Sequence, residues 1–299
     1  MGERMPIKIL EHGRLQDYDV DPSRIGFRWV TMETERWVSV KKLCVVTKNS
    51  VYHWSLDGTT TPAKIFDRHA DTKNCDEIID YLVDAEEKWM LVVGVKVMDG
   101  NIIGLMQLHK RGTDKDRIIQ GHAAMFTSVM VERGIYPTKF FIYGARDQDS
   151  SKLHITEMDH REENPVIPDK TVDIFCQSED TNDFPISIRV SKKYYLIFLL
   201  TKNGYVQLFD LETGICIYVE RISLSSVFAS VPDDLGGIVG VNRTGQILSV
   251  EIDEAYIITH IRNNLNNRDL AIRLARKNNL PGVEDLFPDD TDNSDDIIL

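Results

Sequence analysis

Short apolar runs alternate with polar turns along most of the chain. In five places, two runs rich in β-branched and aromatic residues flank a polar or glycine-containing turn, the pattern of a β-hairpin. The hairpins are predicted over residues 43–54, 89–108, 140–155, 194–209 and 238–250. Their turns are centred on Asn49, Gly100, Ser150, Gly204 and Gly245, and so recur roughly every 40–50 residues.

A repeat of this length built from short strands is typical of the blades of a β-propeller. One small sheet cannot bury both of its faces, whereas sheets stacked around an axis cover one another. The strands of a β-sandwich recur about every 8–12 residues without this longer period. We therefore predict an all-β fold, a β-propeller with about five recognisable blades, over residues 1–260.

The C-terminal segment has a helical pattern instead. Within residues 267–277, Leu270 and Leu274 lie with neighbouring alanines on one face of a helix. Short C-terminal α-helices are expected over residues 261–287. Residues 288–299 hold five Asp and no Lys or Arg, a composition typical of a disordered acidic tail.

Composition narrows the range of partners. The chain has 35 Lys and Arg against 47 Asp and Glu, a net charge of −12. This argues against nucleic acid or an anionic membrane surface as the main partner, because both require basic patches. The four cysteines lie far apart and form no CxxC pair, which favours reduced thiols in a cytoplasmic protein.

Motifs for catalysis or phosphate binding are missing from the sequence. It contains no GxxxxGK[ST], HExxH or GxSxG pattern. The Asp67-Arg68-His69 run could suggest acid–base chemistry, but it has no identifiable nucleophile beside it. We expect no catalytic residues, no metal and no cofactor, and a binding platform in place of an enzyme. Six histidines fall on different predicted blades: His53, His69, His109, His122, His154 and His160.

Specific runs of residues carry a family resemblance. They include Val51-Tyr52-His53-Trp54-Ser55, Phe66-Asp67-Arg68-His69, Gly121-His122-Ala123-Ala124, Asn182-Asp183-Phe184-Pro185, Thr201-Lys202-Asn203-Gly204-Tyr205 and Gly240-Val241-Asn242-Arg243. With these runs the chain resembles the N-terminal domain of the clathrin heavy chain over about residues 5–287. In that family the domain is a seven-bladed propeller followed by a helical linker.

The resemblance implies a non-enzymatic protein of clathrin coats, active in endocytosis and other vesicle-mediated intracellular protein transport. Its partners would be adaptor and accessory proteins, bound through short linear peptides. It would be cytoplasmic, peripheral on coated pits and coated vesicles, and in contact with membranes only through adaptors. The alternatives are an unrelated propeller scaffold, or a propeller hydrolase or lyase with an acid–base or metal cluster near its central channel.

The chain departs from the family near residues 34–35. Thr31-Met32-Glu33 is followed almost at once by Arg36-Trp37-Val38-Ser39, which resembles a strand that family members reach one and a half to two blades later. The family's main groove for leucine-rich acidic clathrin-box peptides lies in the missing stretch, so we expect it to be absent. The shortened propeller could close as a five-bladed ring, stay open as a C-shape, or fail to accumulate.

The family's leg is a second departure. Relatives continue beyond residues 285–287 into a long helical leg that trimerises and binds light chains. Here Pro288 begins an unrelated acidic sequence. Trimerisation and light-chain binding are therefore not supported by these residues.

Two further peptide sites of the family carry over in part. A central pocket for Trp-containing peptides corresponds to Phe27 and Ile79. A second groove, used by loops of arrestin type, corresponds to Trp89 and Leu108. For each of these apolar residues the alternative is an ordinary place in a blade core. The cations that could orient acidic peptide residues at the second groove are Arg111, Lys115 and Arg117.

Overall fold

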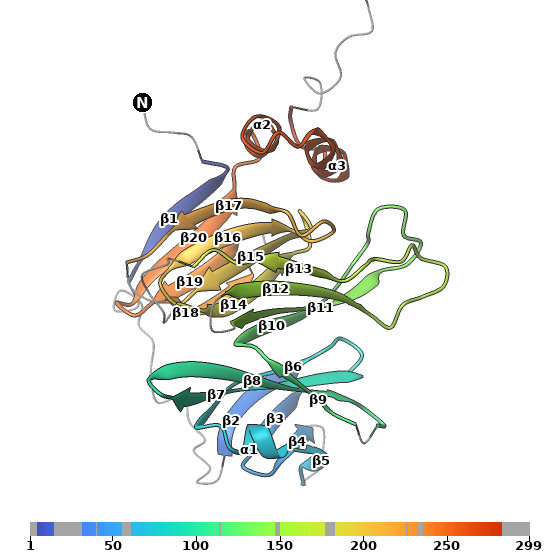
Figure 1. Ribbon diagram of the computed structural model, residues 1–299, viewed down its shortest axis with the longest axis vertical. Helices are drawn as coiled ribbons and strands as arrows, with labels where there is room; N and C mark the ends of the chain where they lie inside the picture. The colour runs from blue at the N-terminus through green and yellow to red at the C-terminus, as the bar shows by residue number, and fades with distance from the viewer. Residues whose placement is uncertain are drawn as a thin grey trace, which may run out of the picture.

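Five four-stranded antiparallel sheets make up most of the molecule (Figure 1). The computed structural model describes residues 5–14, 32–39, 41–55, 61–113, 115–146, 150–176, 183–224, 227–232 and 236–282. This all-β architecture confirms the prediction of a propeller with about five blades.

Four of the sheets are continuous in sequence, and the fifth combines the two ends of the strand-forming region. The first sheet holds β2 (Met32–Ser39), β3 (Lys42–Thr47), β4 (Ser50–Ser55) and β5 (Ala63–Asp67). The second holds β6 (Glu77–Val83), β7 (Trp89–Met98), β8 (Asn101–Lys110) and β9 (Arg117–Gln120). The third holds β10 (Ala123–Val129), β11 (Thr138–Arg146), β12 (Ser151–Met158) and β13 (Lys170–Asp173). The fourth holds β14 (Pro185–Ser191), β15 (Leu196–Thr201), β16 (Tyr205–Asp210) and β17 (Cys216–Arg221). The fifth holds β18 (Val227–Pro232), β19 (Ile238–Asn242), β20 (Gln246–Ile252) and β1 (Ile7–Arg14).

The five predicted hairpins are the second and third strands of the five sheets. The turns within the described ranges lie where the sequence pattern placed them, for example between β15 and β16 at Gly204. Gly204 has φ +80°, and a Cβ there would lie 2.2 Å from the carbonyl oxygen of Ser223. Only glycine fits this turn without strain, because other residues rarely adopt positive φ.

The position near residues 34–35, where we expect the chain to depart from the family, falls inside a strand. β2 runs from Met32 to Ser39 and pairs with β3, with register shifts between Met32 and Thr34 and between Trp37 and Ser39. Residues on both sides of this position therefore belong to one edge strand. β1 pairs in antiparallel register with β20, so the N-terminal strand completes the last sheet.

Alternate residues of the central strands belong to two different cores. On β15, Leu196, Phe198 and Leu200 lie in the core shared with the fifth sheet and the helices. Ile197 and Leu199 lie in the core shared with the third sheet. The continuous apolar run of β15 follows from this burial on both faces.

Four such cores join the five sheets in chain order. They lie between the first and second, second and third, third and fourth, and fourth and fifth sheets. Within the described ranges, no buried hydrophobic cluster joins the fifth sheet to the first. The sheet β2–β5 lies at the opposite end of the stack from the C-terminal helices (Figure 1).

The C-terminal helical prediction is confirmed for residues 268–278. α3 (Arg268–Asn278) buries Leu270, Ala271, Leu274 and Ala275, and the side chain of Asn267 caps its first turn. The preceding helix, α2 (Ile257–Asn263), was not predicted and begins within the range assigned to the propeller. A one-turn helix, α1 (Ala70–Lys73), follows β5. Residues 283–299, which include the end of the predicted helical range and the predicted acidic tail, lie outside the described residues.

Candidate peptide-binding groove between two sheets

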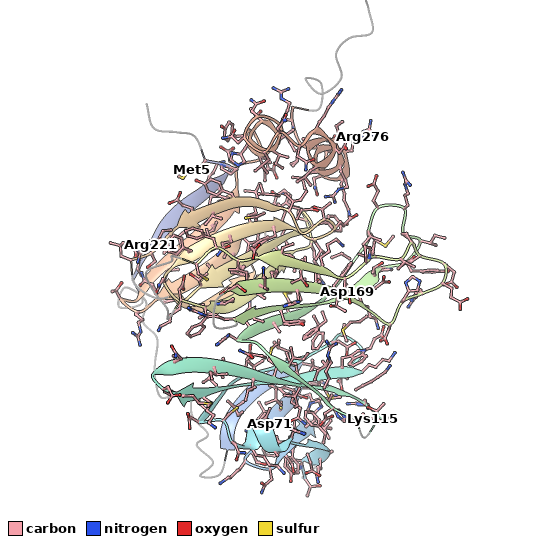
Figure 2. The ribbon with its side chains drawn as sticks, in the orientation of Figure 1. Met5, Asp71, Lys115, Asp169, Arg221 and Arg276 are labelled. Carbon is pink, nitrogen blue, oxygen red and sulfur yellow. The ribbon has the colours of Figure 1, made fainter. Side chains whose placement is uncertain are left out.

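The five residues assigned to the second groove all come from the sheet β6–β9. Trp89 begins β7 and lies opposite Lys110 at the end of β8. Leu108 on β8 lies opposite Arg117 on β9, and Arg111 and Lys115 lie in the connection between those strands. Arg111, Lys115 and Arg117 are exposed, so this edge of the sheet presents cations to solvent (Figure 2).

The two apolar residues of this set also belong to the core between the second and third sheets. Leu108 is only 5% exposed and packs in a buried cluster with Leu91 and Phe141. Trp89 is half-buried and packs at the margin of the same cluster. We call the boundary between the sheets β6–β9 and β10–β13 the seam. Leu108 lies beneath the seam in the buried core, and Trp89 lies at its surface.

Polar contacts of Trp89 tie the two sheets together. Its indole Nε1 donates a hydrogen bond of 3.0 Å to Oδ2 of Asp159, which follows β12 of the third sheet. Lys88 approaches the same carboxylate at 2.8 Å and Lys110 at 3.6 Å. The ammonium of Lys110 also lies 4.8 Å from the centre of the indole ring, within the range of a cation–π contact.

Asp159 remains ionised through this set of contacts. Burial raises its pKa, but the hydrogen bonds from Lys88 and Trp89 outweigh that effect. The pKa of the carboxyl therefore lies below its ordinary value. A neutral site would be held together more weakly, because hydrogen bonds to a charged acceptor are the stronger kind.

A pocket of about 190 Å³ opens beside this cluster, at the boundary of the two sheets. Its lining holds three cations, Lys88, Lys139 and Arg161, and three carboxylates, Glu86, Glu157 and Asp159. The carboxylate of Glu86 lies 2.5 Å from the ammonium of Lys139, again linking one sheet to the next. The seam therefore combines an aromatic edge with cationic side chains, the chemistry that suits a short peptide with apolar and acidic residues.

Of the predicted cations, Arg111 already has a partner. Its guanidinium lies 3.2 Å from Glu87, which also binds Lys42. The hydrogen bond from Lys42 holds the pKa of Glu87 below its usual range. Lys115 and Arg117 lie further along the exposed edge.

The central-pocket residues are not brought together by the described part of the structure. Phe27 lies outside the described residues. Ile79 lies at a β-bulge of β6, is half-buried, and packs against the core between the second and third sheets.

The histidines of the predicted blades have structural partners in the described part of the chain. His109 lies 2.7 Å from Asp116 and stacks on Phe66. The rings of His122 and His154 stack on aromatic neighbours as well. Across the part of the chain that the structure describes, no three His, Cys, Asp or Glu side chains gather as metal ligands.

The Asp67-Arg68-His69 run is structural too. Ser50 donates a hydrogen bond of 2.6 Å to Asp67. Arg68 is buried and binds the backbone oxygens of Thr47 and Thr72. His69 caps α1 through a bond from the backbone of Asp71. These three residues therefore fasten the loop after β5.

Sequence reasoning did not identify Lys88, Lys110, Lys139 and Asp159 as part of the seam. Counting the same number of residues outward from both sides of the Asp99-Gly100 turn would have placed Trp89 opposite Lys110. Asp159 and Lys139 belong to the next sheet, and only packing between sheets brings them here.

No helix among the described residues is both long and apolar enough to cross a membrane.

Comparison with curated proteins finds clathrin heavy chains. The chain is 43% identical over 254 residues to the clathrin heavy chain of Drosophila melanogaster. It is 40% identical over 254 residues to clathrin heavy chain 2 of Homo sapiens. Each match covers 84% of this chain and 15% of the relative, so the chain spans only a small part of the relatives' length.

No family model matches the chain. Among solved structures it is similar to Kluyveromyces lactis Hsv2, with a TM-score of 0.46 and 12% identity over 70% of this chain and 58% of that one. It is also similar to the β-propeller domain of Myceliophteria thermophila Cps50 (Swd1), with a TM-score of 0.46 and 13% identity. That match covers 73% of this chain and 63% of the other.

Proposed function

The chain is a relative of the clathrin heavy chains, and we propose that it docks adaptor and accessory proteins of clathrin coats through short linear peptides. The peptides would bind at the seam between the sheets β6–β9 and β10–β13. Trp89 provides the apolar anchor, and the surrounding cations orient acidic peptide residues.

One observation carries this proposal. The Trp89 side chain, which corresponds to a groove residue of the family, lies half-buried at the surface of the seam with Lys88 and Lys110 beside it. A short peptide could bury its apolar side chain against the indole and place a carboxylate near these ammonium groups. Each such contact would be weak, and several copies on one coat would act together.

We also propose that the protein acts without catalysis, works in vesicle-mediated transport and endocytosis, and is found in the cytoplasm on coated pits and coated vesicles. Membranes are reached only through the adaptors. The main clathrin-box groove of the family is absent, since its blades have no counterpart in this sequence.

Peptide titration tests the site. The probe is a fluorescent acetylated hexapeptide, Gly-Leu-Ile-Asp-Asp-Gly, titrated with the full chain and followed by anisotropy at low salt. Lys110→Glu should weaken binding at this seam by about fivefold or more, because it reverses a charge beside Trp89. Lys48→Glu is the matched control: Lys48 is exposed in the first sheet, far along the sequence from the seam.

Equal affinities for the wild type and Lys110→Glu, measured where circular dichroism shows both to be folded, would rule out the seam. A second probe, a clathrin-box peptide of the form LΦxΦ[DE] (Φ a bulky apolar residue), tests the missing groove. Tight binding of that peptide, unchanged by Lys110→Glu, would contradict the proposed absence.

A further inference from the structure

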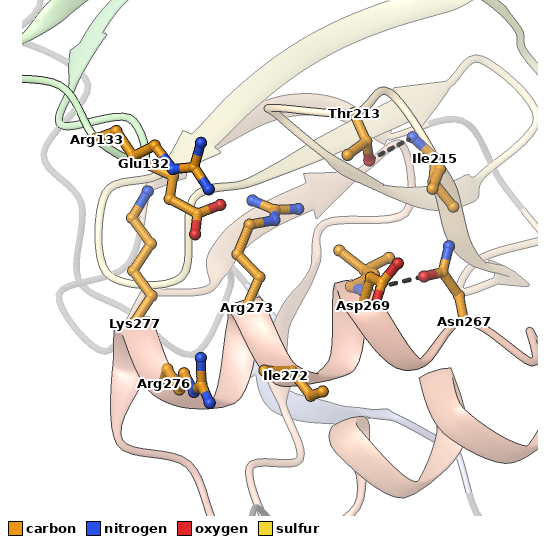
Figure 3. A pocket seen from close by; sticks show the side chains of 11 residues that line it. Glu132, Arg133, Thr213, Ile215, Asn267, Asp269, Ile272, Arg273, Arg276 and Lys277 are labelled. Atoms are coloured by element: carbon orange, nitrogen blue, oxygen red, sulfur yellow. Dashed lines mark hydrogen bonds between the residues drawn. The ribbon is translucent and has the colours of Figure 1, made fainter. Parts of the chain in front are cut away.

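A second pocket, of about 790 Å³, lies between α3 and the turns of the third and fourth sheets (Figure 3). It is lined by residues of the β10–β11 turn, the β16–β17 turn and one side of α3. It shares no lining residue with the small pocket at the Trp89 seam. The two are therefore separate candidate sites.

The pocket is elongated along the helix. Its lining residues on α3 extend from Asn267, the N-cap, to Lys277 near the C-terminal end. At about 1.5 Å of rise per residue this is on the order of 15 Å. Four or five residues of an extended peptide, at about 3.3 Å each, would span that length.

Buried ion pairs make the wall of the pocket rigid. Arg273 of α3 lies 2.5 Å from Asp210, whose side chain is fully buried, and 3.5 Å from Glu212. Lys277 lies 2.5 Å from Glu212, and its ammonium lies 3.4 Å from the ring centre of Tyr195. The helix side chains are thus positioned before any ligand arrives, which lowers the entropic cost of binding.

Charge is unevenly distributed along this pocket. Its cations gather toward the end formed by the second half of α3 and the β10–β11 turn: Arg133, Arg273, Arg276 and Lys277. Three carboxylates lie near these four cations: Glu132 in the lining, and Asp210 and Glu212, which pair with Arg273 and Lys277. One positive charge is therefore in excess at this end. At the other end Asp269 and the amide of Asn267 replace the cations (Figure 3).

Apolar side chains contribute to the lining: Ile215 comes from the β16–β17 turn, and Leu270 and Ile272 come from α3. An apolar ligand side chain buried here would gain free energy in proportion to the surface it removes from water. The pocket therefore offers burial together with a cationic end, in a chain whose net charge is −12.

We propose that this pocket is a second peptide site, which binds an extended acidic–apolar segment of a partner protein alongside α3. An apolar ligand residue packs against Ile215 and Ile272, and a following acidic residue approaches Arg133. The site does not depend on the Trp89 seam. It would allow one propeller to hold two peptides at once.

Methyl-labelled isoleucine NMR of the full chain tests the proposal, with the same hexapeptide Gly-Leu-Ile-Asp-Asp-Gly as the probe. The methyl signals of Ile215 and Ile272 should shift saturably during the titration. Arg133→Glu should weaken that isotherm about fivefold or more, because Arg133 is exposed at the cationic end. A peptide with Lys in place of both Asp residues should leave the two signals unchanged.

Two charge reversals separate this site from the seam. Lys110→Glu should weaken the shift of Ile79, which packs at the core beneath the seam, and leave the Ile215 and Ile272 isotherms intact. Arg133→Glu should do the opposite. If the wild type shows shifts at Ile215 and Ile272 but none at Ile79, the result counts against the proposed function and not against this pocket.

Three results would overturn the proposal. One is the absence of any shift at Ile215 and Ile272 at saturating peptide. Another is a shift of the Ile215 and Ile272 signals when residues 283–299 are deleted and no peptide is added, which would identify the chain's own C-terminal segment as the occupant. The third is a shift of Ile272 with protein concentration alone, which would point to a second copy of the chain.

Discussion

Single buried polar residues connect neighbouring sheets of this protein. His53 on β4 is 5% exposed, and its Nε2 lies 2.9 Å from the hydroxyl of Tyr81 on β6. Its Nδ1 lies 4.0 Å from Glu87. Burial lowers the pKa of His53 to about 4, against a smaller raising effect of Glu87 and lowering effects of Lys42 and Arg111. The imidazole is therefore neutral in the folded protein at pH 7.

We predict that His53 makes the protein acid-sensitive. The unfolded chain takes up a proton on this residue below its ordinary pKa of about 6.5, whereas the folded chain does so only near pH 4. Its contribution to the free energy of unfolding is complete above pH 6.5 and falls as the pH drops toward 4. The loss is on the order of 2–3 kcal/mol.

The measurement for His53 is urea unfolding of the wild type and His53→Gln between pH 7.5 and 4.5. Glutamine can still form a hydrogen bond with Tyr81, as donor or acceptor, but does not titrate. The variant should be less stable at pH 7 and show a shallower decline toward low pH. Parallel pH curves for the two proteins would show that His53 is not responsible.

At the scale of elements, α3 is attached to the propeller by charge as well as by apolar packing. Its buried face joins the core of the fourth and fifth sheets, and Arg273 reaches the fully buried Asp210 at the end of β16. Asp210 also accepts hydrogen bonds of 2.7 and 2.6 Å from Thr213. The helix, the turn and the strand are thereby fixed together.

Removing one partner of this pair should be costly. Arg273→Met would leave Asp210 buried without its cation, and we expect a loss of about 3–5 kcal/mol in the free energy of unfolding. Arg276→Met, an exposed change on the same helix, should stay within about 0.5 kcal/mol. Denaturant unfolding measures both.

A double variant separates the effect of the broken ion pair from other effects of the Arg273→Met substitution. Asp210→Asn combined with Arg273→Met removes the unpaired charge and should recover part of the loss. If the double variant is as unstable as the sum of its single changes, the ion pair does not couple the helix to the sheet.

Element types were predictable where the pattern was local. The five hairpins were visible because their polar turns separate two apolar runs, and α3 was visible because Leu270 and Leu274 repeat at helical spacing. α2 was missed because its residues, Ile257 to Asn263, are rich in β-branched side chains, which favour strands. Its burial against the sheets outweighs that preference.

Sites built by packing between sheets were less accessible. Trp89 and Leu108 could be located through the family resemblance, but the contact of Trp89 with Asp159 joins residues 70 positions apart. The pairing of β1 with β20 likewise depends on the complete fold. Local sequence patterns do not specify such contacts. Residues far apart in the chain come together only when the cores between the sheets have assembled.

At the scale of the molecule, five sheets share four cores. The face of β3 and β4 turned away from the nearest core carries two cross-strand apolar pairs, Leu43 with Trp54 and Val45 with Tyr52. Val45 is buried and the other three are half-buried. Roughly 400 Å² of such surface represents on the order of 10 kcal/mol, similar to the net stability of a domain. The stability of this propeller therefore depends strongly on how much of the outer face of each end sheet is buried.

Peptide binding at the seam beside Trp89 is the basis of the proposed function. The most direct measurement is the ¹⁵N indole signal of Trp89, assigned by its disappearance in Trp89→Phe, during titration of the full chain with Gly-Leu-Ile-Asp-Asp-Gly. Because the indole Nε1 donates to Asp159 at the seam, a bound peptide should shift this signal saturably while the indole of Trp54, in the first sheet, stays in place. An unmoved Trp89 signal at saturating peptide would contradict the account.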